Sequence, residues 1–153
     1  METPDNLQEA MSMAAREWVE LCQSANVRLD YSIDSVRVVE QQLARLHDQI
    51  PRGLVARFTK ARPPDAEIHR MAMRSGAYVA EVLRRNIGGE WTTQSEAFPG
   101  KDVLTFRHPG GLELWPHVKT EKRIREGGAE NVWAYIQALL GQIGPAAAPP
   151  AGA

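Results

Sequence analysis

The segment IHRMAMRSGAYVAEVLRRNIGGEW, residues 68–91, decides the fold of this chain. Its apolar residues recur at three-to-four spacing on more than one side, which predicts a central helix that is packed on several faces. The helix begins at Pro63-Pro64-Asp65, and Gly88-Gly89 stops it. Gly76 in the middle costs about 1 kcal/mol against alanine, which indicates either the close approach of another element or a hinge. Trp91 then opens a strand-like segment, so the helix leads directly into a sheet.

Two further helices are predicted before this segment. Apolar residues recur at helical spacing from Asp5, a candidate N-cap, to about Ser24. After the irregular stretch VRLDY, Ser32 caps a second helix that Pro51 ends. Residues 52–62 are basic with three apolar residues, and the pattern leaves open whether they form a loop or a short helical turn.

The part of the chain after Gly88-Gly89 predicts a small antiparallel meander. Short strands are expected at residues 90–93, 103–106 and 112–115, with turns at Pro99-Gly100 and around Gly110-Gly111. Residues 117–126 form a charged connection with about one helical turn. A last helix is expected from Glu130 to Ile143 and packed on the sheet. The tail from 145 to 153 is Ala- and Pro-rich, and we expect it to be disordered.

These elements predict a single α+β domain over residues 1–144, with two N-terminal helices, a central helix, a three-stranded meander and a C-terminal helix. Its 153 residues suffice for one real core, and a net charge of −1 gives no global attraction to nucleic acid or anionic membrane. The chain has no apolar run of membrane-spanning length and no secretory signal at its N-terminus. We therefore expect a cytoplasmic protein, and the excess of arginine over lysine together with abundant alanine suggests a bacterial source.

Motifs for chemistry are scarce. Nucleotide-binding glycine loops, HExxH and GxSxG are absent from the sequence. His108 and His117 flank the predicted hairpin with Glu113 between them, but the favoured interpretation is exposed polar residues at strand ends rather than a metal site. Cys22 is the only cysteine, and its helical apolar pattern favours an inert core thiol over a reactive one. The sequence therefore predicts no catalytic set, no metal site and no cofactor.

The polar end of the central helix gives one candidate ligand site. Glu81 and Arg85 are spaced i,i+4 in the favourable order for an ion pair, and Trp91 follows just beyond the helix end. Because arginine stacks on indole and also binds carboxylates, these three residues are candidates for a polar pocket between helix and sheet. The simpler interpretation is a solvated ion pair beside a core tryptophan.

A second candidate is an interaction surface of four cationic residues. These are Arg84, Lys119, Lys122 and Arg123. The interleaved Glu121 and Glu126 favour a solvated face instead. We expect most aromatic residues to lie in the core. One or two aromatic residues exposed on the sheet would mark a surface that binds a partner.

The pattern GxYxxE…GGxW…PxxKxxKR resembles that of a loose group of small uncharacterised bacterial α+β proteins, classed as domains of unknown function. The matching positions are Gly76, Tyr78, Glu81, Gly88, Gly89, Trp91, Pro116, Lys119, Lys122 and Arg123. The resemblance covers residues 68–140 and consists of structural signatures rather than catalytic motifs. Some similar small proteins are suspected partners or immunity proteins in toxin systems, which the resemblance carries over only as a prior expectation.

Three classes of function remain open, and whether the chain is an enzyme is among the open questions. The favoured one is a non-enzymatic protein-interaction domain, adaptor-like or immunity-like, which predicts an exposed apolar or aromatic patch. The second is a small-ligand-binding protein or enzyme that uses Glu81, Arg85 and Trp91. The third, and the least favoured, is a nucleic-acid accessory protein with a basic stripe. The expected partner is another protein, and a homodimer through a sheet edge is a further option.

Overall fold

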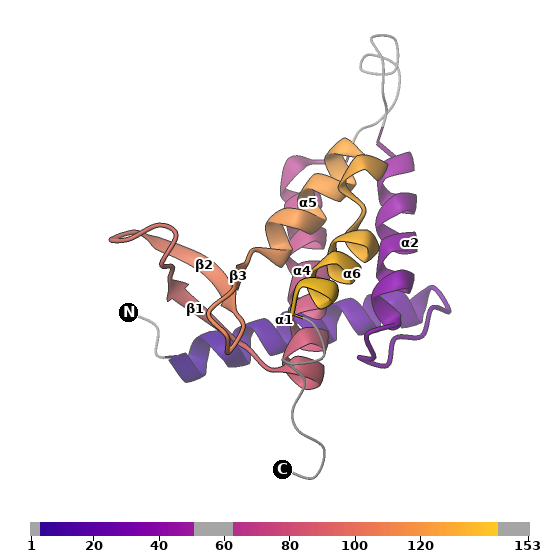
Figure 1. Cartoon of the computed structure of the whole chain (residues 1–153). Helices are drawn as coiled ribbons and strands as arrows, with labels where there is room; N and C mark the ends of the chain where they lie inside the picture. The colour runs from indigo at the N-terminus through magenta and orange to yellow at the C-terminus, as the bar shows by residue number, and fades with distance from the viewer. Residues whose placement is uncertain (1–3, 51–62, 144–153) are drawn as a thin grey trace.

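The computed structural model of the chain describes residues 4–50 and 63–143 and shows an α+β fold (Figure 1). Over these ranges it has five α-helices, one 3₁₀ turn and three strands. In chain order they are α1 (Pro4–Ser24), α2 (Ser35–Asp48), α4 (Asp65–Ile87), β1 (Glu90–Gln94), β2 (Asp102–Arg107), β3 (Glu113–Leu114), α5 (Pro116–Glu126), η1 (Gly128–Glu130) and α6 (Val132–Ile143). Two predictions lie outside the described ranges: the loop or helical turn at residues 52–62 and the disordered tail at residues 145–153.

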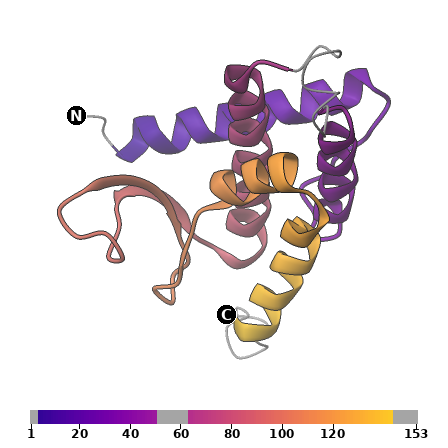
Figure 2. The same cartoon turned by 90° about the horizontal axis from the view of Figure 1, so that it is seen from above.

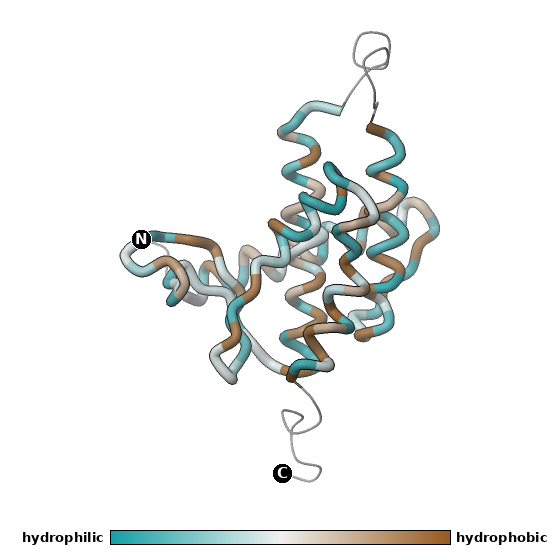
Figure 3. The backbone as a smooth tube through the Cα atoms, turned by 45° about the horizontal axis from the view of Figure 1, so that its top comes forward, coloured by the Kyte–Doolittle hydropathy of each residue, from teal (hydrophilic) through white to brown (hydrophobic). Residues whose placement is uncertain are grey.

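Helix α4 is the centre of the structure, as its sequence predicts. It is crossed by α1 on one side and packs against α5 on another, which the two views show from the front and from above (Figures 1 and 2). An unbroken run of its residues, Ser75 to Leu83, is buried. Apolar residues recur between polar ones along the helices (Figure 3). In α1 and α2 the buried positions include Met11, Trp18, Val36 and Leu43, so each of these two helices has an apolar side in the core.

The crossing of α4 and α5 explains Gly76. A Cβ atom at Gly76 would lie 2.4 Å from the Cα atom of His117 and 2.5 Å from its backbone nitrogen. These atoms belong to the first turn of α5, which therefore approaches the backbone of α4 at the glycine. The predicted close approach of another element is thus confirmed.

The sheet is a meander in the order β1-β2-β3, with both pairs antiparallel, as predicted. Trp91 pairs with Phe106, which in turn pairs with Leu114, and all three side chains are buried on the inner face. Because side chains alternate along a strand, the neighbouring Thr105 and Trp115 belong to the outer face. The helix stop before β1 has positive φ at both Gly88 (87°) and Gly89 (131°), which favours glycine.

Two predictions for the C-terminal part were wrong. Residues 116–126 form the complete helix α5 rather than a connection with a single turn. The sequence did not predict α5 because its buried side lacks an apolar pattern. After Pro116 the buried residues are Thr120, Arg123 and Ile124, and only Ile124 is apolar. The last helix, α6, begins at Val132 and packs against α2 and α5 rather than on the sheet. In the described ranges no helix is long and apolar enough to cross a membrane.

Candidate functional site

The polar end of α4 gathers two arginines around one buried carboxylate. Glu81 is 3% exposed, and its two oxygens accept hydrogen bonds from Arg84 Nε (3.0 Å), Arg84 Nη2 (2.5 Å) and Arg85 Nε (3.0 Å). Burial opposes the ionisation of Glu81, but the hydrogen bonds from the two arginines outweigh it and hold the pKa of the carboxyl below its usual value. The predicted Glu81–Arg85 pair is therefore present, and Arg84 shares it.

The aromatic partner of Arg85 is Tyr31, from the loop between α1 and α2. The guanidinium carbon of Arg85 lies 3.7 Å from the centroid of the Tyr31 ring, which is a stacking distance. The Tyr31 ring in turn packs on the Tyr78 ring, with centroids 5.0 Å apart. We call Tyr31, Tyr78, Glu81, Arg84 and Arg85 the Arg–Tyr cluster.

The backbone of Tyr31 is held in an unusual conformation. Its φ of 61° lies in the left-handed region, which costs a non-glycine residue about 1 kcal/mol or more. Two hydrogen bonds from α4 hold it there: its N–H donates to the Tyr78 hydroxyl (2.9 Å), and its carbonyl accepts from Asn86 Nδ2 (2.9 Å). The Ser35 hydroxyl donates to the Ser32 carbonyl (2.6 Å), so Tyr78 donates its own proton to Ser35 (2.7 Å). The ring position is thus fixed by long-range contacts.

Trp91 takes partners other than Arg85. It is buried on the inner face of the sheet, where its ring contacts Phe106 (5.6 Å between centroids) and His117 (5.7 Å). The structure therefore brings Glu81 and Arg85 together with Tyr31, whereas Trp91 belongs to the core between the sheet and α5. Tyr31 was missed as a site residue because it lies 54 positions before Arg85, and local spacing carries no signal for such a contact.

The four residues of the predicted cationic surface have different environments. Arg84 pairs with Glu81, and Lys119 pairs with Glu130 at 2.6 Å. Arg123 is buried, and its Nε donates to Glu40 at 2.8 Å. Lys122 is exposed. Three of the four are thus engaged in ion pairs rather than aligned as a free basic stripe.

The buried Arg123–Glu40 pair ties three helices together. Glu40 belongs to α2, Arg123 to α5, and the second Glu40 oxygen accepts the N–H of Val132 at the start of α6 (2.8 Å). Nearby, His47 Nδ1 is hydrogen-bonded to the Ile124 carbonyl (2.7 Å). These contacts give Arg123 a structural role that accounts for its burial.

The histidines do not gather with acidic residues into a metal site in the described part of the chain. His108 is buried rather than exposed, contrary to the prediction, and its Nδ1 accepts the N–H of Gly110 (3.1 Å), a local turn contact. Glu113 instead binds Arg107, at 2.8 Å, and also accepts the N–H groups of Glu96 and Ala97. The Arg107 hydrogen bond and these backbone donors lower the pKa of Glu113 to about 2.

Two groups that can act in catalysis are held in their neutral forms by burial. The pKa of His117 is lowered to about 4, mainly because the imidazole is buried. The ring is therefore neutral near pH 7. Burial also raises the pKa of the Cys22 thiol to about 11. A thiol with that pKa is a poor nucleophile, as the interpretation of Cys22 as a core residue predicts.

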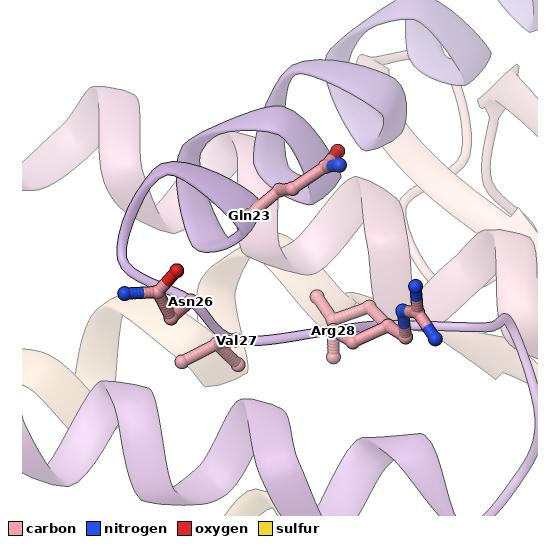
Figure 4. Close-up of a pocket in the computed structure, with 5 residues that line it drawn as sticks. Gln23, Asn26, Val27 and Arg28 are labelled. Atoms are coloured by element: carbon pink, nitrogen blue, oxygen red, sulfur yellow. The ribbon is translucent and has the colours of Figure 1, made fainter.

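An open cavity lies at the end of α1. Its volume is about 410 Å³, and it is lined by Gln23, Asn26, Val27, Arg28 and Leu29. Figure 4 shows Gln23 extending from the last turn of α1, with Asn26, Val27 and Arg28 following along the loop. Asn26 has a positive φ of 61°, which turns the chain at this point. This cavity is a polar hollow beside the loop that carries Tyr31.

The outer side of the sheet carries an exposed apolar surface. Trp115 follows β3, and its Nε1–H donates to the Thr105 hydroxyl (3.1 Å), which fixes the indole. Phe98, 45% exposed, packs edge-on against Trp115 with centroids 5.8 Å apart. Val118, 43% exposed, lies one turn later in α5, and its N–H donates to the Trp115 carbonyl. We call Phe98, Trp115 and Val118 the Phe98 patch.

Comparison of the chain with protein-family models, with curated proteins and with solved structures finds no match.

Proposed function

We propose that this chain is a non-enzymatic protein-interaction domain, adaptor-like or immunity-like, and that the Phe98 patch is its contact surface. The observation that carries the proposal is the exposure of Phe98, which packs on a tryptophan whose orientation a hydrogen bond fixes, together with the exposure of Val118 three residues after that tryptophan. Large apolar side chains gain free energy when they leave water, at about 25 cal/mol per Å². A partner that offers an apolar side chain to this surface would obtain that gain.

The rigidity of the patch supports recognition by protein. Thr105 accepts the Trp115 N–H and donates its own proton to the Val103 carbonyl (2.8 Å), so the indole rests on a satisfied hydrogen-bond chain. A side chain that is already fixed loses little conformational entropy when a partner covers it. Aromatic anchors of this kind dominate the energetics of protein interfaces.

Three described groups that could act in catalysis are buried, which also favours binding over catalysis. Glu81 accepts hydrogen bonds on both oxygens, and burial keeps His117 neutral and Cys22 protonated near pH 7.

The test is affinity capture from source cells with the tagged chain and two single variants, Phe98→Asp and Met13→Asp. Met13 is the matched control, because it is 54% exposed but lies on α1. We expect one stoichiometric protein to be captured at high salt by the wild type and by Met13→Asp, and to be lost with Phe98→Asp. Equal capture by all three proteins would contradict the assignment of the patch.

A second copy of the chain could also cover the Phe98 patch. Light scattering on the same proteins distinguishes such self-association from binding of a different protein. The proposal predicts that the wild type and Phe98→Asp have equal mass in solution. A dimer that Phe98→Asp converts to a monomer would identify a second copy as the occupant and would overturn the adaptor-like function.

A further inference from the structure

The Arg–Tyr cluster keeps hydrogen-bond donors at the surface that the fold does not use. Half of the Arg85 side chain (50%) and 40% of the Arg84 side chain are exposed. A guanidinium group carries five N–H donors. Arg85 donates only its Nε–H to Glu81, and neither of its terminal amino groups has a partner among the described residues. Arg84 likewise keeps Nη1 without a partner there.

The stacking on Tyr31 fixes the plane of these donors. Because the ring covers one face of the Arg85 guanidinium at 3.7 Å, and Glu81 holds the Nε side, the two terminal amino groups form the remaining open edge. Carboxylates bind guanidinium groups along such an edge with two parallel hydrogen bonds. The arginine is therefore held ready for a carboxylate, and less side-chain entropy is lost on binding.

The charge of the cluster matches an anion with a single charge. Glu81 neutralises one of the two arginines, which leaves one positive charge at the exposed edge. From α1, Arg16 and Glu20 also reach Tyr31 electrostatically, but with opposite signs. Asp30 acts electrostatically on Tyr78, and its Oδ1 accepts both the N–H and the hydroxyl of Ser32, which favour its ionised form.

We infer that the Arg–Tyr cluster is a binding site for a carboxylate side chain of an acidic peptide segment, held by the terminal amino groups of Arg85 and flanked by Arg84. A doubly charged phosphate fits less well, because the five residues of the cluster carry one net positive charge. The Arg–Tyr cluster shares no residue with the apolar Phe98 patch and would bind a different chemical group. The carboxylate site and the proposed function can therefore be tested separately.

The test is an NMR titration of the full, isotope-labelled chain that follows the Nε–Hε signals of its arginines. The probes are a capped Gly-Glu-Gly peptide, its Gly-Gln-Gly counterpart and inorganic phosphate. Arg70 is an internal control, because it is similarly exposed and pairs with Glu67 one turn away on the same helix. Matched variants are Arg85→Lys, Arg70→Lys and Tyr31→Phe.

We expect the Glu peptide to shift the Arg84 and Arg85 signals saturably, with a Kd of the order of millimolar for one bidentate contact. The Arg70 signal and the Gln peptide should give no saturable shift. Arg85→Lys keeps the positive charge but loses the pair of parallel N–H donors, and should weaken binding of the Glu peptide by about tenfold. Tyr31→Phe keeps the ring and should bind like the wild type, as should Arg70→Lys.

Three results would overturn the inference. They are the absence of a saturable shift with the Glu peptide, an equal shift of Arg70, and phosphate binding at least as tight as that of the Glu peptide. Because none of these probes touches the Phe98 patch, a negative result here leaves the proposed function in place.

Discussion

Replacing Gly76 by alanine tests the packing of α5 on α4. An added Cβ would lie 2.4 Å from the Cα atom of His117 and 2.9 Å from the carbonyl carbon of Pro116. These are backbone atoms that cannot rotate away, so α5 must shift, and overpacking of this severity costs about 3 kcal/mol. Alanine gains about 1 kcal/mol over glycine inside a helix. The net expectation is that Gly76→Ala lowers the free energy of unfolding by about 2 kcal/mol.

Gly141 in α6 is the matched control, because a Cβ there would meet no atom of the described chain within 4 Å. Gly141→Ala should raise the free energy of unfolding by about 0.5–1 kcal/mol through helix propensity alone. The assay is urea unfolding followed by circular dichroism and tryptophan fluorescence, with midpoints and slopes compared. If Gly76→Ala were as stabilising as Gly141→Ala, the tight helix crossing would be refuted.

Three further predictions concern buried groups. Arg123→Ala should lower the free energy of unfolding by about 3–5 kcal/mol, because it leaves Glu40 buried without its cation; the exposed neighbour Lys122 should tolerate alanine within about 0.5 kcal/mol in the same urea assay. The neutral His117, with a pKa of about 4, contributes stability that is complete above its unfolded pKa of about 6.5 and is lost as the pH falls toward 4. His117→Leu should therefore flatten the decline in urea midpoint between pH 6.5 and 4, and an unchanged decline would contradict the burial of this imidazole. Cys22 should react with a thiol reagent in the native protein only at the rate of unfolding, and fast labelling without denaturant would count against a core thiol.

The sequence predicted those parts of the fold that local patterns determine. The bounds of α4, the stop at Gly88-Gly89 and the order of the strands follow from apolar periodicity and turn residues, which are properties of neighbouring positions. Helix α5 was missed because its inward positions include Thr120 and Arg123. Thr120 donates to the Ala72 carbonyl (2.7 Å) and Arg123 to Glu40, so burial of these polar groups depends on partners far away in the chain.

The same distinction applies to the candidate site. The Glu81–Arg85 pair follows from i,i+4 spacing on one helix, and the structure contains it. The stacking of Arg85 on Tyr31 depends on a loop that a hydrogen bond to Tyr78 holds in place, and no spacing rule contains that contact. The Phe98 patch could not be predicted from the sequence either. The outward direction of Trp115, on which Phe98 packs, follows from alternation along the sheet only once the register of β2 and β3 is known.

The most direct test of the interaction function is a photo-crosslinker placed at single positions of the chain in source cells. Benzoylphenylalanine at Phe98 preserves an aromatic side chain on the patch, and the same residue at Met13 reports on a similarly exposed position of α1. Our account predicts one discrete heterologous adduct from position 98 and none at that mass from position 13. Identical adduct patterns from both positions, or no adduct from position 98, would contradict the claim that the Phe98 patch binds a protein partner.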